Sequence, residues 1–359
     1  MNSVYTNRLT SLRKKIEELN ADAALVTKRE NYMYMSGFTG TSAILLITKS
    51  RALLLTDFRY VEQAASQAPA YEIIKYNGSY IAEINKLIGN DKKTVLAFED
   101  SYVTYRDYKQ YKDNLNVRDM IPLGTSFEEL RRVKDESEMQ LIRQAVKIAD
   151  DAFVHILDYI KPGIAEVEIA AEMEYFMKKE GASGASFDTI VASGMRSSMP
   201  HGVASEKKLE TGDVVTMDYG ALYKGYCSDI TRTVFLGKPK AELKKIYQIV
   251  LDAQMKGIEA VKQGIKSKDV DKIARDHIAE AGYGNYFGHG LGHGVGLEIH
   301  EDPTLSPRGE ITLQDGMIVT VEPGIYVPGL GGVRIEDMLV VRGQNAEDLT
   351  KAKKDLITV

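Results

Sequence analysis

The first third of the chain alternates helical spacing with short apolar runs. Leu9, Leu12 and Ile16 recur at intervals of three and four residues, which predicts an amphipathic helix. Short apolar runs between turn-forming residues are typical of buried strands, and strands that alternate with helices favour an α/β domain with a mixed sheet. The predicted strands cover residues 23–27, 43–48, 52–56 and 94–98, and further helices are predicted from Tyr60 and over 79–88.

Longer helices follow the segment 121–126, whose Pro and Gly residues mark the predicted boundary between two domains. Asp135 and Glu138 have the spacing of a capping box, and the apolar residues after them repeat at helical intervals until Pro162 and Gly163. Strand-like segments separate this helix from later ones, so the second domain is predicted to be α+β. The predicted domains are residues 1–125 and 126–359, and the later helices cover 167–179, 241–261 and 267–281.

The composition is that of an ordinary globular protein, with 44% hydrophobic and 27% charged residues, and it excludes a disordered or collagen-like chain. The 359 residues carry a net charge of −5 without a basic block, which argues against nucleic acid as a partner. The single cysteine, Cys227, excludes an intrachain disulfide and a thiolate metal cluster. Since we find neither a signal-peptide core nor an apolar run of the ~20 residues that span a membrane, we expect a cytoplasmic protein that binds no membrane.

One segment of the second domain is repeated. Residues 212–220 resemble residues 316–324, and the two segments lie 104 positions apart. Each contains a turn, an apolar strand, a carboxylate and a glycine. The carboxylates are Asp218 and Glu322. We interpret the repeat as an internal duplication that brings these two acids together across a pseudo-twofold axis.

Each repeated strand is followed by a second acid across a Gly-containing turn. Asp229 follows Asp218 at hairpin spacing, and Glu336 follows Glu322 after the glycines at 331 and 332. Four clustered carboxylates repel one another and resist ionisation unless cations offset their charge. Two divalent ions would do so, and they would also supply a nucleophile at neutral pH because they lower the pKa of water.

The histidines add a nitrogen donor to this predicted site. His289, His293 and His300 lie in the Gly-rich segment 288–301, and His201 is a further candidate. Ordering so many glycines is costly, which favours a site that needs close backbone approach. An oxygen-rich set with one nitrogen and no sulfur suits Mn²⁺, Co²⁺, Fe²⁺ or Zn²⁺. The remaining histidines, His155 and His277, are interpreted as structural or solvated.

These motifs together resemble the Xaa-Pro aminopeptidases and Xaa-Pro dipeptidases (prolidases) of metallopeptidase family M24, over nearly the whole chain. The resemblance implies an α/β creatinase-like N-terminal domain followed by a "pita-bread" catalytic domain with internal pseudo-twofold symmetry. The motifs are Ser36-Gly37-Phe38-Thr39-Gly40, Met199-Pro200-His201-Gly202, Met217-Asp218-Tyr219-Gly220, Ser228-Asp229-Ile230-Thr231-Arg232-Thr233, the segment 288–301, Glu322-Pro323-Gly324 and Gly332-Val333-Arg334-Ile335-Glu336-Asp337.

The resemblance also implies roles for individual residues. It places two divalent ions, Mn²⁺ first among the candidates, in each subunit, with Asp229 and Glu336 bridging them. It implies a catalytic set and a substrate-binding set. We further expect Arg334 to orient the carboxylate of Asp337 or Asp229. The implied metal ligands are Asp218, Asp229, His293, Glu322 and Glu336; the catalytic residues are His201, His300 and Glu322; the substrate-binding residues are His201, His289, His300, Tyr326 and Arg334.

The implied activity is cleavage of the bond before proline, by an Xaa-Pro aminopeptidase that acts as a homodimer or higher oligomer. A dipeptidase is the alternative that shares this chemistry. A methionine aminopeptidase shares the metal fold, and a non-catalytic peptide-binding relative is the alternative from another class. Two bound divalent ions would offset most of the net charge of −5, so the metal-free protein is predicted to be less stable.

Overall fold

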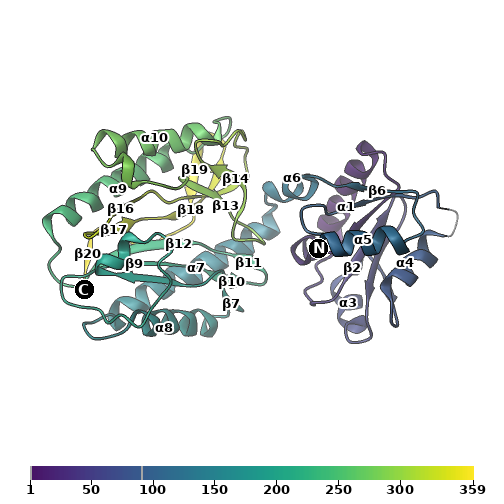
Figure 1. Ribbon diagram of the computed structural model, residues 1–359, viewed down its shortest axis with the longest axis horizontal. Coiled ribbons are helices and arrows are strands. Elements are labelled where there is room, and N and C mark those ends of the chain that lie inside the picture. Colours follow the sequence, from purple (N-terminus) through teal and green to yellow (C-terminus); the bar gives the residue numbers. More distant parts are fainter. Residues whose placement is uncertain (1, 90–91) are drawn as a thin grey trace. The chain divides into compact units, whose positions relative to one another are not determined.

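The computed structural model describes residues 2–89 and 92–359, which form two compact units (Figure 1). One unit extends to Arg131 and the other covers Arg132–Val359. The first unit continues beyond residue 125 because helix α6, Ser126–Arg132, packs within it. Arg131 donates a hydrogen bond to Asn31 at 2.8 Å from this helix. None of the helices among the described residues is long and apolar enough to cross a membrane.

The first unit is built on a six-stranded sheet in the order β4-β3-β2-β1-β5-β6. The β1–β2 and β2–β3 pairs are antiparallel and the other pairs are parallel, which confirms the predicted mixed sheet. The elements are α1 Asn2–Glu18, β1 Ala23–Val26, α2 Arg29–Ser36, β2 Ile44–Thr48, β3 Ala52–Thr56, α3 Val61–Gln67, β4 Glu72–Lys75, α4 Tyr80–Ile88, β5 Val95–Phe98, α5 Tyr105–Asn114 and β6 Asp119–Pro122.

The second unit begins with two helices that pack against one sheet. Helix α7, Glu136–Tyr159, starts at the predicted capping box, in which Asp135 accepts from the backbone of Glu138 and the Glu138 side chain accepts from that of Asp135. Helix α8 covers Glu166–Lys179. Their apolar faces form one core with the sheet β20-β12-β9-β8. The strands of this half are β7 Gly184–Ala185, β8 Ile190–Ser193, β9 Val214–Tyr219, β10 Ala221–Tyr223, β11 Tyr226–Cys227, β12 Ile230–Phe235 and β20 Ile357–Thr358, with the 3₁₀ helix η1 at Gly194–Ser198.

The other half of this unit repeats the arrangement. Helices α9, Ala241–Ala260, and α10, Ser267–Glu280, form a core with β15 and β18, as α7 and α8 do with β9 and β12 (Figure 1). In each half the strand of the repeated segment pairs antiparallel with a later strand. The pita-bread fold with internal duplication is thereby confirmed. The remaining elements are η2 Gly284–Tyr286, β13 Gly292–Gly294, β14 Glu301–Leu305, β15 Ile318–Val321, β16 Gly324–Val327, β17 Gly331–Arg334, β18 Asp337–Arg342 and β19 Asn345–Asp348.

Candidate active site

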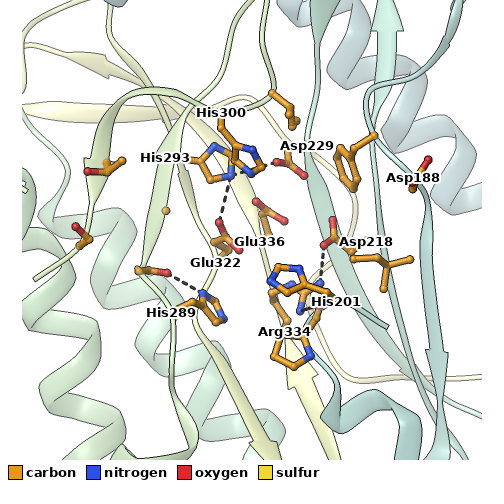
Figure 2. Close-up of a pocket in the computed structure, with 18 of the residues that line it drawn as sticks. Asp188, His201, Asp218, Asp229, His289, His293, His300, Glu322, Arg334 and Glu336 are labelled. Carbon is orange, nitrogen blue, oxygen red and sulfur yellow. Dashed lines mark hydrogen bonds and ion pairs between the residues drawn. The ribbon is translucent and has the colours of Figure 1, made fainter. Parts of the chain in front are cut away.

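A cavity of about 590 Å³ opens in the second unit, between the two halves of the duplicated fold (Figure 2). Its volume is in the range of small-molecule sites. Polar groups converge on it from strand ends, and Phe187, Ile190, Val203 and Ile299 supply apolar walls. The titratable and charged residues in its lining are Asp188, His201, Asp218, Asp229, His289, His293, His300, Glu322, Arg334 and Glu336.

The five predicted metal ligands all line this cavity. Asp218 lies near the end of β9, and Asp229 directly precedes β12. Glu322 follows β15, and Glu336 lies between β17 and β18. His293 is the central residue of β13. The duplicated strands therefore bring carboxylates from positions far apart in the sequence to one place, as the repeat predicts.

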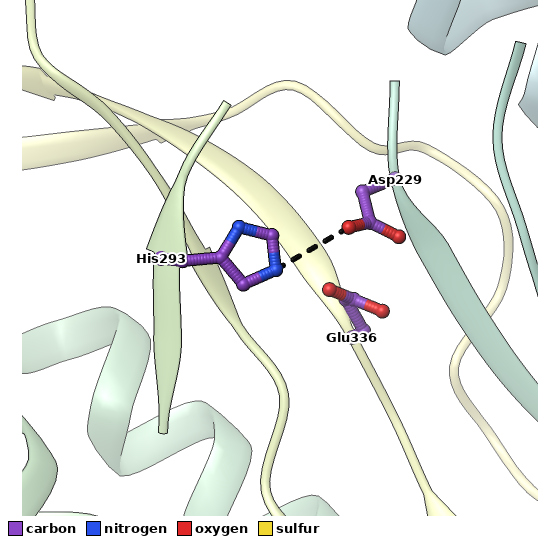
Figure 3. A group of neighbouring side chains, drawn as sticks. All are labelled: Asp229, His293 and Glu336. Atoms are coloured by element: carbon purple, nitrogen blue, oxygen red, sulfur yellow. Dashed lines mark ion pairs between the residues drawn. The ribbon is translucent and has the colours of Figure 1, made fainter. Parts of the chain in front are cut away.

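His293 is the point at which the acids of the two halves meet. Its Nε2 atom is 3.3 Å from Glu322 Oε1 and 3.5 Å from Asp229 Oδ2. Its Nδ1 atom lies 3.0 Å from the carbonyl oxygen of Gly294, which fixes the ring when Nδ1 carries the proton. One ligand atom from each of Asp229, His293 and Glu336 lies within 4.8 Å of the others, so these three residues can hold one ion (Figure 3).

Two buried oxygens favour a cation in this place. Asp218 Oδ1 and Glu336 Oε1 accept no hydrogen bond from any residue that the structure describes. The second oxygen of each carboxylate is satisfied: Asp218 Oδ2 accepts from Arg334 at 2.5 Å, and Glu336 Oε2 from the Thr231 hydroxyl at 2.7 Å. An unsatisfied buried polar atom is unfavourable, and a divalent cation would satisfy both. The residues therefore fit a hard, oxygen-seeking metal.

The electrostatics of the acids lead to the same conclusion. Burial and the neighbouring carboxylates raise the pKa of Asp229 and of Glu336 well above the usual value. Burial also raises the pKa of Asp218, although Arg334 opposes this effect. Burial disfavours the charged form of Glu322 too, but the hydrogen bond and positive charge of His293 outweigh it and lower the pKa. Four acids in this cavity therefore need more positive charge than Arg334 and His293 supply.

A chain of hydrogen bonds runs from Asp218 into the wall of the cavity. Arg334 donates to Asp218 and, at 2.8 Å, to the Tyr326 hydroxyl oxygen. That oxygen is 2.9 Å from His289 Nε2, and His289 Nδ1 is 2.8 Å from the carbonyl oxygen of Gly290. With the proton on Nδ1, Tyr326 donates to His289. Burial lowers the pKa of His289, in agreement with a neutral ring.

This chain corrects the prediction for Arg334. Arg334 is 3% exposed and orients Asp218, not Asp337 or Asp229. Asp337 is held instead by Arg232, with 2.7 Å between Oδ1 and Nη2. Tyr326, predicted to bind substrate, is not among the described residues that line the cavity, but its hydroxyl contacts the lining residues His289 and Arg334.

The other four histidines differ in their position relative to the cavity. His201 and His300 line the cavity, and the His300 ring lies 4.5 Å from that of His293 between centroids. Burial and the positive charge of His293 lower the pKa of His300. His155 lies 2.7 Å from Glu172, and neither it nor His277 is part of the described cavity lining.

Sequence reasoning assigned no site role to Thr231, Asp188 or Phe187. Thr231 supports Glu336 and accepts a hydrogen bond from Arg334 Nε at 3.0 Å. The spacing offered a signal, because Thr231 lies two residues after Asp229 and alternate residues of an extended chain point to the same face. Asp188 and Phe187 reach the cavity from the loop before β8, where no periodic pattern marks them.

Comparison with known proteins agrees with this geometry. Residues 140–343 match metallopeptidase family M24, and residues 8–133 match the creatinase/prolidase N-terminal domain. The chain belongs to metallopeptidase family M24. As a member of this hydrolase family it is an enzyme that uses divalent metal.

Several proteins that resemble the chain over nearly its whole length carry proline-specific names. A protein named Xaa-Pro dipeptidase from Pyrococcus horikoshii is 40% identical over 99% of this chain and 99% of its own length. The structure of an Xaa-Pro dipeptidase from Bacillus anthracis is 49% identical, covering 99% of this chain and 100% of that one with a TM-score of 0.97. The structure of an X-Pro aminopeptidase from Thermotoga maritima is 41% identical, covering 96% and 100%, with a TM-score of 0.91.

Proposed function

We propose that the protein is an Xaa-Pro dipeptidase, a hydrolase that cleaves dipeptides whose second residue is proline. The observation that carries the proposal is the cavity in which five ligand-type side chains converge and two buried carboxylate oxygens have no described partner. Relatives at 40–41% identity that are named Xaa-Pro dipeptidase support the substrate class. The dipeptidase therefore replaces the aminopeptidase as the first candidate.

The proposed metal centre consists of Asp218, Asp229, His293, Glu322 and Glu336. We assign two divalent ions to it, with Mn²⁺ as the first candidate and Asp229 and Glu336 shared between them. Bound there, the ions would supply an activated water at neutral pH and polarise the scissile carbonyl. Arg334 fixes Asp218 and Thr231 fixes Glu336, which restricts their orientation before a metal binds.

The reaction requires a proton at the leaving nitrogen. The nitrogen of proline carries no hydrogen in the peptide bond, so it leaves as an amine only after a proton is delivered to it. Glu322 is assigned this transfer, because its carboxylate lines the cavity beside His293. His201 and His300 line the same cavity and are assigned hydrogen bonds to the substrate carbonyl oxygen as negative charge develops on it. His289 is assigned contact with the substrate from the wall of the cavity.

A peptide panel tests the proposal. Protein reconstituted with Mn²⁺ is assayed on Xaa-Pro dipeptides, on Xaa-Pro-Xaa tripeptides and on Met-Ala-Ser. We expect rapid release of proline from dipeptides, slower cleavage of tripeptides and no release of methionine from Met-Ala-Ser. Preference for tripeptides would support an X-Pro aminopeptidase, the second candidate, which the Thermotoga maritima structure favours. No cleavage of any proline peptide would contradict both candidates.

A further inference from the structure

The loop that carries His201 is attached at both ends to one buried carboxylate. The loop runs from Ser193, at the end of β8, to Ser205, and Pro200, His201 and Val203 from it line the cavity. Glu166, the first residue of α8, is 0% exposed and lies beneath the loop. It does not belong to the cavity lining or to the proposed metal centre.

The carboxylate of Glu166 binds both ends of this loop. Its Oε1 atom accepts from the backbone nitrogen and hydroxyl of Ser193, at 2.7 and 2.8 Å. Its Oε2 atom accepts from the backbone nitrogen and hydroxyl of Ser205, at 3.1 and 2.7 Å. Arg196, inside the loop, forms an ion pair with the same oxygen. One carboxylate therefore accepts five hydrogen bonds from the loop and closes its thirteen residues, 193–205.

The loop has little apolar burial to replace these bonds. Met195, Met199 and Val203 are 65%, 54% and 51% exposed. Other polar contacts reach its middle: Gly332 N donates to the Ser197 hydroxyl at 2.8 Å, and Arg334 donates to the carbonyl oxygen of Pro200 at 3.3 Å. Val203 also forms an isolated antiparallel bridge with Ile190 of β8. The loop is thus positioned mainly by hydrogen bonds, and those at its two ends converge on Glu166.

Arg196 extends the attachment towards His201. Besides its ion pair with Glu166, it donates from Nη2 to the carbonyl oxygen of Val203 at 3.0 Å. The backbone nitrogen of Val203 in turn donates to the carbonyl oxygen of His201 at 2.9 Å. The position of His201 is therefore linked to Glu166 through three consecutive interactions. A displacement of about 1 Å at a reacting site can lower a rate by about a hundredfold.

We propose that Glu166 is a positioning residue for His201, which it holds at the substrate by closing the loop 193–205. The inference rests on the proposed function, because it takes His201 as a substrate-contacting residue. It adds a residue from the first turn of α8, a helix that contributes no residue to the described cavity lining. Loss of the carboxylate leaves the five metal-ligand positions intact and lets the loop move.

The first test measures the loop itself. Hydrogen exchange of the holoenzyme, followed by mass spectrometry, is compared between wild type and Glu166→Gln. We expect peptides that cover 193–205 to exchange at least tenfold faster in the variant, with peptides from β9 and β12 unchanged. Ser205→Ala removes one of the five donors and provides a milder second variant, with an expected acceleration of about threefold. Unchanged protection of the loop in both variants would overturn the proposal without any reference to activity.

The second test is a double-mutant cycle on Xaa-Pro hydrolysis at matched metal content. We expect Glu166→Gln to lower kcat/KM about tenfold in the wild-type background and less than twofold in a His201→Ala background, because both changes remove the same interaction. The matched control is Glu138→Gln, in α7. Glu138 is also buried and accepts hydrogen bonds from Asp135 N and the Tyr226 hydroxyl, but it is not part of the cavity lining. Its substitution should leave kcat/KM within twofold of wild type.

The outcomes distinguish failure of the positioning role of Glu166 from failure of the proposed dipeptidase function. Equal losses from Glu166→Gln in both backgrounds would show that it acts independently of His201 and overturn its positioning role. A wild-type enzyme that cleaves no Xaa-Pro peptide would contradict the proposed function instead, and the exchange measurement would then still decide whether Glu166 holds the loop.

Discussion

Arg232 and Asp337 form an ion pair in the interior of the second unit, with 2.7 Å between Nη2 and Oδ1 and side chains 1% and 0% exposed. Arg232 lies on β12, which follows Asp229, and Asp337 directly follows Glu336. Arg232 also donates to the carbonyl oxygen of Glu336 at 2.5 Å. The pair therefore joins the two strands whose acids are proposed to share both metal ions.

The same ion pair also contacts the C-terminal segment 352–354. Arg232 donates to the carbonyl oxygens of Ala352 and Lys353, at 2.7 and 3.1 Å. The second oxygen of Asp337 accepts from Gln254 at 2.7 Å and forms an ion pair with Lys354. Removing one charge from a buried pair leaves the other uncompensated, which typically destabilises a protein by about 3–5 kcal/mol.

We therefore expect Asp337→Asn to lower the free energy of unfolding by about 3–5 kcal/mol, measured by urea denaturation of the metal-free protein. The control is Asp276→Asn, which removes an exposed ion pair with Lys272 and should change stability little because solvent screens such pairs. A loss in Asp337→Asn no larger than in this control would contradict the interpretation of the pair as a structural connection.

Metal content tests the proposed ligands directly. Asp229→Asn and Glu336→Gln each remove a carboxylate that we assign to both ions, so each variant should bind fewer than two Mn²⁺ per chain by elemental analysis, with activity reduced at least a hundredfold. Asp188→Asn changes an exposed carboxylate of the same cavity and should retain wild-type metal content. Full metal content with near-wild-type turnover in Asp229→Asn would exclude its bridging role.

Metal should also stabilise the fold in the same samples. An ion that binds only the folded chain adds about 2.7 kcal/mol at a hundred times its Kd. Removal with a chelator should therefore lower the Tm of the wild type by several degrees and that of Glu336→Gln by less. Equal shifts in both proteins would argue against Glu336 as a ligand.

The sequence predicts elements best where one local pattern decides them. The capping box at Asp135 and the apolar face of α7 are local signals, and the helix lies where they predict it. Helix α2, Arg29–Ser36, was not predicted because eight residues are too short for a clear periodicity. Strand β4, Glu72–Lys75, was not predicted because its two isoleucines lie between charged residues and form no longer apolar run. Helix α2 forms with five of its residues buried, and β4 forms by pairing with β3 at the edge of the sheet.

The residues of the candidate site also differ in how well the sequence predicts them. Asp218 and Glu322 are visible because a duplication repeats a nine-residue pattern, and both line the cavity. The partner of Arg334 was predicted wrongly because sequence proximity favours Asp337, whereas Asp218 comes from a strand more than a hundred residues earlier. Glu166 gives no signal in the sequence, since its role depends on where the ends of a distant loop meet.

The pH dependence of stability has a contribution from Asp348. Burial and the neighbouring Asp337 carboxylate raise the pKa of Asp348 from 3.8 to about 6, and its side chain is 26% exposed. The folded protein thus holds this proton more tightly than the unfolded chain. The stabilisation is fully present below about pH 4 and is lost as the pH rises through 6.

Asp348→Asn cannot titrate and should lack this contribution. Relative to wild type, its free energy of unfolding should increase by about 2 kcal/mol between pH 4.5 and 7.5, from urea denaturation at each pH. Asparagine can still accept the bond from Thr350 N, although the ion pair with Lys354 is lost. Asp276→Asn should follow the wild-type pH profile. A constant difference between Asp348→Asn and wild type would show that Asp348 does not titrate in this range.

The hydroxyl of Tyr326 connects Arg334 to His289, and its removal separates positioning from metal binding. In Tyr326→Phe, Arg334 Nη1 retains only the long contact to Pro200, and His289 loses its donor. We expect kcat/KM for an Xaa-Pro dipeptide to fall about tenfold with metal content unchanged, and stability to fall by about 1–3 kcal/mol because buried polar groups lose partners.

The matched control is Tyr247→Phe. Its buried hydroxyl contacts the carbonyl oxygens of Lys354 and Asp355 at 3.1 Å each, so it should lower stability and leave kcat/KM near the wild-type value. Loss of metal in Tyr326→Phe would instead indicate that the Tyr326 hydroxyl acts through Arg334 to orient Asp218 as a metal ligand.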